Sequence, residues 1–293
     1  MRWNASETVC TVLLTFIFGA SAAAQEASPA PPPSPAPLVA PPEPAPTPSP
    51  STGPPPRALR GAHDQRRTVR GYPANLAYNF MGVVTPGNYP VLAAGVVLTA
   101  PAFLLDDEVD DYFVRHPHKN WGDIGRNLGG TLAISGLTVG LFSAGRVARG
   151  ERFRATTYDL SQAIIVNFTY TMALKFIVGR ERPDHSNNQS FPSGHASNAF
   201  AAASVIAHHY GDALGIPAYA VATYIAGSRL ASHRHHLSDV VAGSVFGYGV
   251  GRAVYRRNSR PPEAGAVDPK AMILEPDPGP SGDGVGLRLS VRF

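Results

Sequence analysis

The sequence has little cysteine, little net charge and no long apolar run. Its single cysteine, Cys10, excludes a disulfide scaffold and a zinc module built on cysteine. The formal net charge is only +4 and the Lys and Arg residues are scattered, which argues against a nucleic-acid binder. No uninterrupted stretch of 18 apolar residues marks an obvious multi-span membrane protein. What is present, 293 residues of which 44% are hydrophobic, suffices for one domain with a sizeable core.

Residues 1–24 have the features of a secretory signal peptide. Arg2 precedes an apolar stretch from Val9 to Ala20, and small residues up to Ala24 offer a cleavage site before Gln25. An uncleaved anchor helix is the alternative. We favour cleavage, because the apolar stretch is short and no basic residues follow it. The sequence therefore predicts secretion across the inner membrane into the periplasm, and leaves open whether the protein also associates with the membrane or inserts into it.

Residues 25–64 form a linker with a biased composition. Of the 29 prolines in the chain, 15 fall between Pro29 and Pro56, interspersed with Ala and Ser. Such a segment has little apolar surface to bury and favours extended, polyproline II-like conformations. We expect a disordered spacer without a fold of its own.

Residues 65–258 have the pattern of an all-α domain, a single bundle of about six helices. Apolar stretches of helical length alternate with connections that hold Gly, Pro, Asn and charged residues. Several stretches are near 15 residues, short of the roughly 20 that cross a bilayer. Glycines recur at four-residue spacing and predict close helix approach, at Gly136/Gly140 and at Gly243/Gly247/Gly251. The expected helices are Val91–Leu105, Leu128–Ala144, Leu160–Val178, Ser197–His209, Pro217–Arg229 and Asp239–Tyr255.

Residues 259–293 form a tail with strand character. Met272-Ile273-Leu274 is followed, after Pro, Gly and Asp, by a strictly alternating apolar pattern from Val285 to Phe293. The pattern predicts a short C-terminal β-hairpin, which we expect to dock on the bundle.

Three segments carry residues suited to phosphate chemistry, and the first is Lys175, Arg182 and Pro183. Lys175 and Arg182 are seven residues apart, so both can lie on one helix face until Pro183 ends the helix. Two cations directed at one point suit a tetrahedral oxyanion. A basic helix end that merely complements the helix dipole is the simpler alternative for this segment alone.

The second segment is Phe191-Pro192-Ser193-Gly194-His195, directly before a helical Ala-rich run. A small-residue turn that opens a helix exposes backbone N–H groups to an anion. The hydroxyl of Ser193 and the absence of a side chain at Gly194 both suit close contact with a ligand. A simple N-cap at Ser193 with a surface His195 explains the same residues equally well.

The third segment contains Ser228-Arg229, His235 and Asp239. Asp239 lies four residues after His235, so its carboxylate can accept from one imidazole nitrogen and leave the other to attack. Arg229 adds a further cation. A metal site at His233, His235 and His236 is disfavoured, because the last two are adjacent and no set of ligands at metal spacing accompanies them. We expect no metal.

Together, these segments resemble the three-part signature of the type 2 phosphatidic acid phosphatase and vanadium haloperoxidase superfamily. The resemblance spans about Leu160 to Tyr255 and implies a role for each matching residue. The implied phosphate clamp consists of Lys175, Arg182, Arg229, Ser193 and the amide of Gly194. The implied catalytic residues are His235 as the nucleophile that forms a phosphohistidine, His195 as the general acid and Asp239 as the partner that orients His235. The chain departs from the family at His236-Leu237, where an aromatic residue and Pro are frequent.

The resemblance implies a metal-independent phosphatase that hydrolyses phosphomonoesters or diphosphates, with lipid phosphates such as phosphatidic acid or a prenyl diphosphate favoured. Three cations, an in-line His235 and an acid opposite it are what phosphoryl transfer needs. The expected partners are a phosphorylated lipid or a small phosphate ester and the membrane surface, with no nucleic acid and no cofactor. The alternatives are a soluble periplasmic acid phosphatase, a haloperoxidase holding vanadate, and a phospholipid-binding envelope protein without turnover.

Three further groups of residues have simpler explanations. An acidic run from Asp106 to Asp111 lacks the alternate-ligand spacing of a Ca²⁺ loop, so we expect a solvated loop or helix start. His208 and His209 are expected at a helix end, and Trp121 is expected to anchor a connection by packing.

Overall fold

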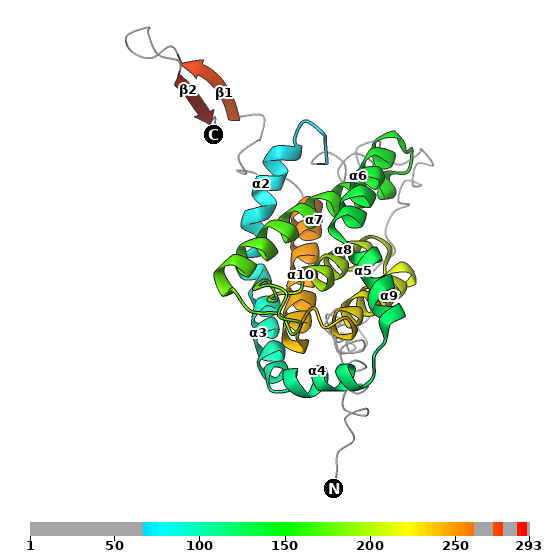
Figure 1. Cartoon of the computed structure of the whole chain (residues 1–293). Coiled ribbons are helices and arrows are strands. Elements are labelled where there is room, and N and C mark those ends of the chain that lie inside the picture. The colour runs from blue at the N-terminus through cyan, green and yellow to red at the C-terminus, as the bar shows by residue number, and fades with distance from the viewer. Residues whose placement is uncertain (1–66, 261–271, 278–285, 292–293) are drawn as a thin grey trace, which may run out of the picture.

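The computed structural model describes residues 67–260, 272–277 and 286–291. The predicted signal peptide and the predicted Pro-rich linker lie outside these residues and stay predictions. Nine α-helices occupy most of residues 72–259, which confirms the all-α class (Figure 1). In chain order the elements are α2 (Tyr72–Val83), the 3-10 turn η2 (Pro86–Asn88), α3 (Tyr89–Phe103), α4 (Asp106–Arg115), α5 (Lys119–Gly129), α6 (Thr131–Val147), α7 (Glu151–Val178), α8 (Gly194–Tyr210), α9 (Asp212–Ala231), α10 (Leu237–Ser259), β1 (Met272–Asp277) and β2 (Gly286–Val291).

All six predicted helices are present; α7 ends at Val178 as predicted, the other ends differ, and three further helices were not among the predicted ranges. The additional helices are α2, α4 and α5. They lack a continuous apolar stretch: α4 begins with three acidic residues, and α5 has glycines at positions 122, 125 and 129. Acidic side chains in a first turn stabilise a helix through its dipole, which accounts for α4 despite its polarity.

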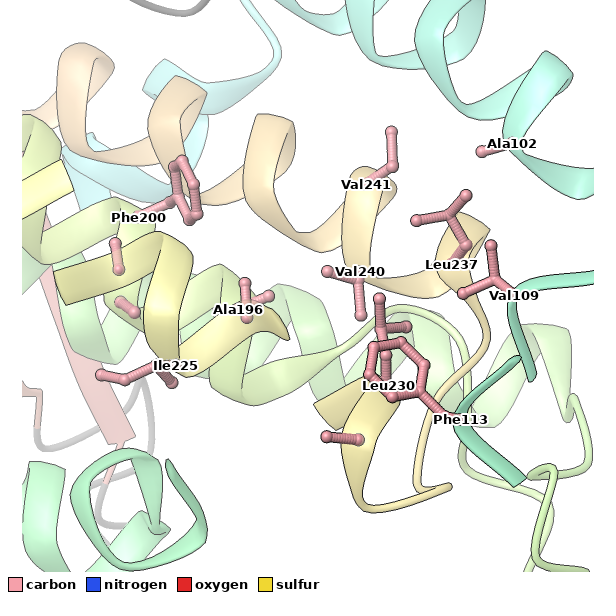
Figure 2. Packing of buried hydrophobic residues seen from close by; sticks show 14 of the residues in the cluster. Ala102, Val109, Phe113, Ala196, Phe200, Ile225, Leu230, Leu237, Val240 and Val241 are labelled. Atoms are coloured by element: carbon pink, nitrogen blue, oxygen red, sulfur yellow. The ribbon is translucent and has the colours of Figure 1, made fainter. Parts of the chain in front are cut away.

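The core is organised around α8, which packs against α7, α9 and α10. One cluster of buried apolar side chains joins α8, α9 and α10 to the end of α3 and to α4, where Phe113 packs with Leu230 and Val240 (Figure 2). A second cluster joins α2, α7, α8 and α10 and contains Val166, Val205 and Val250. Figure 1 shows α4 lying across the end of the bundle, between α3 and α5.

Helices α8 and α10 approach closely along the predicted glycine row. A Cβ atom at Gly243 would lie 2.5 Å from the carbonyl oxygen of Ser193, and one at Gly247 would collide with the carbonyl of Ser197. By contrast, a Cβ at Gly136 or Gly140 meets no described atom within 4 Å, so the close approach expected there is absent. The α8–α10 contact fixes the first turn of α8 against the first turns of α10.

A buried carboxylate, Asp159, ties both ends of the bundle together. Its side chain is fully buried in α7 and accepts two hydrogen bonds from Arg67, at 2.9 and 2.8 Å. Nε2 of His209, near the end of α8 as expected, lies 2.8 Å from Oδ2, and the amide of Asn258 in α10 donates to Oδ1 at 2.7 Å. A buried charge needs such partners, since alone it would cost several kcal/mol.

The tail forms the predicted strands, and the longest helix differs in part from expectation. The predicted hairpin forms as antiparallel β1 and β2, with Met272 opposite Val291. The expected docking of this hairpin on the bundle stays a prediction. Helix α7 is continuous over 28 residues, and among the described residues it alone is long and apolar enough to cross a membrane. The number rises to three if two bent pairs, α2 with η2–α3 and α5 with α6, each form one span.

Candidate active site

Lys175 lies in the last turn of α7 and is 7% exposed. Its ammonium donates to the carbonyl oxygens of Gln189 and Ser190, at 2.6 and 3.3 Å. The helix ends at Val178, and Gly179 takes a left-handed φ of 59° that favours glycine. The end of the predicted range Leu160–Val178 is therefore confirmed, whereas the expectation that Lys175 and Arg182 share a helix face up to Pro183 is wrong. Arg182 reaches the site from the loop that follows.

The loop from Gly179 to Ser193 is closed by its own backbone and by α10. The amide of Ser190 donates to the carbonyl of Arg180 at 2.9 Å, and the amide of Ser193 donates to the backbone carbonyl of Asp239 at 2.9 Å. A cis peptide bond joins Phe191 to Pro192. These contacts bring the first two segments against the third.

Ser193 and Gly194 open α8 as predicted, with Ser193 at the N-cap position. The hydroxyl of Ser193 makes no capping bond, is fully buried and has no hydrogen-bond partner among the described residues. The simple capping alternative therefore does not describe this serine. Backbone N–H groups at the start of a helix and an unpaired hydroxyl beside them are a suitable anion site.

His195 lies in the first turn of α8, against α5. A Cβ atom at Gly129 would lie 2.6 Å from Cδ2 of its ring, so only glycine leaves room for the imidazole. Burial, followed by the positive charges of Arg229 and His235, lowers the pKa of His195 to about 3. Nε2 has no described hydrogen-bond partner. The alternative of a surface histidine is thus wrong.

Arg229 lies in the last turn of α9 and is 4% exposed. Nε and Nη1 have no described hydrogen-bond partner. Burial, followed by the positive charges of Arg182 and Arg234, lowers the pKa of Arg229 to about 10. The two clamp arginines therefore lie close enough to repel each other, although they come from separate elements.

His235 lies in the loop between α9 and α10 and is 3% exposed. Nδ1 is 3.8 Å from Oδ2 of Asp239, which is beyond hydrogen-bond distance. Burial lowers the pKa of His235 to about 4; Asp239 opposes this shift, and the charges of Lys175 and Arg229 reinforce it. A neutral imidazole at pH 7 suits a nucleophile.

Asp239, in the first turn of α10, is fully buried and is held by donors other than His235. Oδ2 accepts from the hydroxyl of Ser190 at 2.5 Å and from the amide of His236 at 2.9 Å, and Oδ1 accepts from Arg180 at 2.8 Å. Burial would raise the pKa of Asp239, but Ser190 and the charges of His235 and Arg180 keep it below its usual value. Asp239 is therefore an anion directed at His235.

Sequence reasoning missed four residues that hold Asp239 or its neighbours: Asp106, Arg180, Ser190 and Ser238. Arg180 and Ser190 lie inside the loop between the first two segments, but the spacing pattern leaves their positions unspecified. Asp106 was expected to be solvated and is 4% exposed, so that part of the expectation is wrong. Its buried contacts come from residues more than 70 positions away, which no local signal reveals.

The histidines of the third segment are separated by their contacts. Nδ1 of His233 lies 2.8 Å from Oδ1 of Asp110 in α4, away from His235. Within residues 67–260, 272–277 and 286–291, no three His, Cys, Asp or Glu side chains gather as a metal site would require. The three segments instead hold buried polar atoms without a described partner, namely Nε of Arg182, Oγ of Ser193, Nε2 of His195, Nε and Nη1 of Arg229, and Nδ1 of His235.

Comparison with known proteins matches residues 157–261 to the PAP2 superfamily, which confirms the resemblance read from the three segments. A lipid A 1-phosphatase from Porphyromonas gingivalis is 38% identical over 84 residues, 28% of this chain and 19% of that protein. A PA-phosphatase related-family protein from Dictyostelium discoideum is 28% identical over 134 residues, 36% of this chain and 49% of that protein. The chain thus spans about a fifth and about half of these relatives.

Two solved structures are similar over about half of the chain. LpxE from Aquifex aeolicus is 21% identical with a TM-score of 0.45, and the match covers 52% of this chain and 95% of that one. A transmembrane PAP2 type phosphatidylglycerolphosphate phosphatase from Bacillus subtilis is 19% identical with a TM-score of 0.49, covering 57% and 93%.

Proposed function

We propose that this chain, whose residues 157–261 match the PAP2 superfamily, is a metal-independent phosphatase acting through a phosphohistidine. The observation that carries the proposal is the set of buried polar groups without described partners on Arg182, Ser193, His195 and Arg229, three of which lie close enough to interact electrostatically with His195 or His235. Unpaired buried polar groups are costly, and several that converge on one point suit an anionic ligand. A phosphoryl group has the oxygens to accept from all of them.

The geometry assigns each residue one step. Nδ1 of His235 faces Asp239, so Nε2 is the atom that attacks phosphorus. The bond from phosphorus to the leaving oxygen breaks as the N–P bond forms, and His195 protonates that oxygen. Lys175, Arg182 and Arg229 offset the charge that spreads over the three equatorial oxygens. Water then attacks the phosphohistidine and gives its proton to His195, which releases inorganic phosphate and restores neutral His235.

Exposed apolar side chains beside the clamp favour a lipid substrate. Phe176 and Ile177 follow Lys175 directly and are 71% and 79% exposed. Phe103, at the end of α3, stacks on Phe191 of the second segment. The next residue, Leu104, is 85% exposed. An apolar surface next to a phosphate site suits an acyl or prenyl chain better than a soluble ester.

The length of α7 and the exposed apolar side chains of α3 support a location in a membrane. At about 1.5 Å per residue, the 28 residues of α7 exceed the hydrocarbon thickness of a bilayer. Val96 and Val97 of α3 are also exposed, at 71% and 69%. We therefore favour a bundle inserted in the inner membrane, with the site open to the periplasm. Alkaline carbonate extraction tests this, because a protein released into the supernatant would contradict insertion.

Phosphate release by the purified full-length protein in EDTA tests the activity. Phosphatidic acid, a prenyl diphosphate and a water-soluble aryl phosphate are the substrates, His235→Ala is the inactive variant, and His116→Ala at an exposed position is its matched control. We expect turnover that survives EDTA, disappears in His235→Ala and persists in His116→Ala. A faster reaction with the aryl phosphate would indicate a soluble-type acid phosphatase instead.

Absence of phosphate release from every substrate would contradict the phosphatase. Bromination that requires vanadate and peroxide would then indicate the haloperoxidase. Phospholipid binding that His235→Ala leaves unchanged would indicate a binding protein without turnover.

A further inference from the structure

The acidic start of α4 is buried against the catalytic segments. The carboxylate of Asp106 accepts three contacts from residues that surround Asp239. Oδ1 accepts from the amide of Ser238 at 2.8 Å, and Oδ2 accepts from the hydroxyl of Ser238 at 2.7 Å and from Nη2 of Arg180 at 2.8 Å. A carboxylate at the first turn of α10 also complements the dipole of that helix. Asp106 therefore belongs to the site in space, although it lies 129 positions before His235 in the numbering.

Arg180 is the link between Asp106 and Asp239. Nη1 donates to Oδ1 of Asp239 at 2.8 Å and to the hydroxyl of Ser238 at 2.6 Å, while Nη2 holds Asp106. The guanidinium also lies over the ring of Phe103, 4.8 Å from its centre. The planar guanidinium of Arg180 is held by hydrogen bonds at both Nη atoms and by the ring of Phe103 on one face, so it has little freedom to rotate.

The pairing also sets how much of the charge of Arg180 falls on Asp239. With Asp106 in place, the guanidinium is shared between two carboxylates. Without Asp106, Arg180 would have Asp239 as its only described carboxylate partner, and the pair would compete with the attraction between Asp239 and His235. Asp106 thus preserves both the position and the charge of the group that faces the nucleophile.

One turn further along α4, Asp110 contacts the loop that carries His235. Its carboxylate lies 2.8 Å from Nδ1 of His233, whose φ of 50° is uncommon for a residue other than glycine. A side-chain contact at such a residue helps to hold the loop conformation. Asp106 and Asp110 are four residues apart and share a helix face. Through them, α4 contacts the chain before His235, at His233, and after it, at Ser238.

We propose that Asp106 is a positioning residue for the reaction, which through Arg180 and Ser238 fixes the carboxylate of Asp239 against His235. The inference rests on the proposed function, because it assigns Asp239 to the orientation of the nucleophile. It adds a residue from α4, outside the three segments of the signature.

The test compares kcat and KM for phosphatidic acid in EDTA among full-length wild-type protein, Asp106→Asn, Arg180→Gln and the double variant. Asp107→Asn, on the exposed side of the same turn, is the matched control, and thermal unfolding checks that each protein folds. We expect Asp106→Asn to lower kcat about tenfold or more, the order of one hydrogen bond to a charged group, with little change in KM. The double variant should be no slower than Arg180→Gln, because both changes act on one carboxylate.

An Asp106→Asn protein with wild-type kcat would overturn the inference, as would losses that multiply in the double variant. If Asp106→Asn does not fold, Ser238→Ala decides, since it removes only the two contacts of the Ser238 hydroxyl, with Asp106 and with Arg180, and keeps the backbone contact to Asp106. A lower kcat in Ser238→Ala supports the inference, and an unchanged kcat overturns it. A wild-type protein that releases no phosphate would overturn the proposed function and this inference together, whereas active wild type with equally active Asp106→Asn overturns the inference alone.

Discussion

Nδ1 of His235 lies 3.8 Å from Oδ2 of Asp239, and that oxygen already accepts from Ser190 and from the amide of His236. The imidazole and the carboxylate are therefore adjacent without sharing a hydrogen bond. The protein, and not the imidazole, holds the carboxylate in place. A small movement of the imidazole would close the bond to Asp239 while the carboxylate keeps its contacts with Ser190 and His236.

Asp239→Asn tests the role of that carboxylate. The variant keeps the shape of the side chain but removes the negative charge that stabilises a cationic imidazole during attack. We expect kcat to fall by about 10²-fold or more, as when the aspartate of a catalytic triad is replaced by asparagine. Initial rates with phosphatidic acid measure it, with exposed Asp123→Asn as control; kcat within threefold of wild type would remove Asp239 from the mechanism.

Arg229→Lys tests whether the clamp requires a guanidinium. Lysine keeps the charge but loses the fork that presents Nε and Nη1, the two atoms without a described partner. We expect kcat/KM to fall by about 10²-fold, the cost of one oxyanion donor. The control is Arg115→Lys, at a side chain that is 65% exposed. Full activity in Arg229→Lys would show that a point charge suffices.

Phosphate binding should be coupled to proton uptake by His195. In the protein without ligand the pKa of His195 is lowered to about 3, so the ring is neutral at pH 7. A bound phosphate dianion favours the imidazolium and raises this pKa, so binding takes up a proton and strengthens as the pH falls. Calorimetry of inorganic phosphate binding, in two buffers of different ionisation enthalpy, measures the uptake.

His195→Gln is the control for that experiment, because it retains a polar side chain without a titratable nitrogen. The proton uptake should shrink in this variant and remain in His235→Ala. Equal uptake in wild type and His195→Gln would assign the proton to another group, the phosphate included.

Gly247→Ala tests the close contact between α8 and α10. A methyl group there collides with the backbone carbonyl of Ser197, so the helices must separate and shift the first turn of α8. We expect a loss of about 1–3 kcal/mol in the free energy of unfolding, together with lower activity. Gly136→Ala meets no described atom within 4 Å and should be neutral or slightly stabilising. Equal unfolding midpoints for the two variants would contradict the contact.

The sequence predicted the helices whose apolar stretches are continuous, and it predicted the residues whose identity and spacing are both specified. The helical class is confirmed, and α8 begins at Gly194, three residues before the predicted Ser197. The predicted range Leu160–Val178 ends where α7 ends, but the residue that ends the helix is Gly179, with its left-handed backbone, and not Pro183. The acidic run was expected to be a solvated loop or a helix start; the helix start is confirmed as α4, but the burial of Asp106 was not predicted.

The contacts that hold the candidate site together were also beyond the reach of the sequence. Asp106 reads as a surface residue from its acidic neighbours, and only the approach of α10 buries it. Ser190 and Arg180 lie in a loop where many residue types are compatible with the spacing. Long-range pairing decides their roles, and a pattern of local periodicity does not contain that information.

The buried Asp159 has a consequence for any attempt to shorten the chain. Its carboxylate oxygens accept hydrogen bonds from Arg67, which precedes α2, and from Asn258, in the last turn of α10. A version trimmed from the N-terminus keeps this pairing only if the cut falls before Arg67, and one trimmed from the C-terminus only if it falls after Ser259, whose hydroxyl also contacts Arg67. A shortened chain that keeps these contacts of Asp159 therefore needs both Arg67 and Asn258.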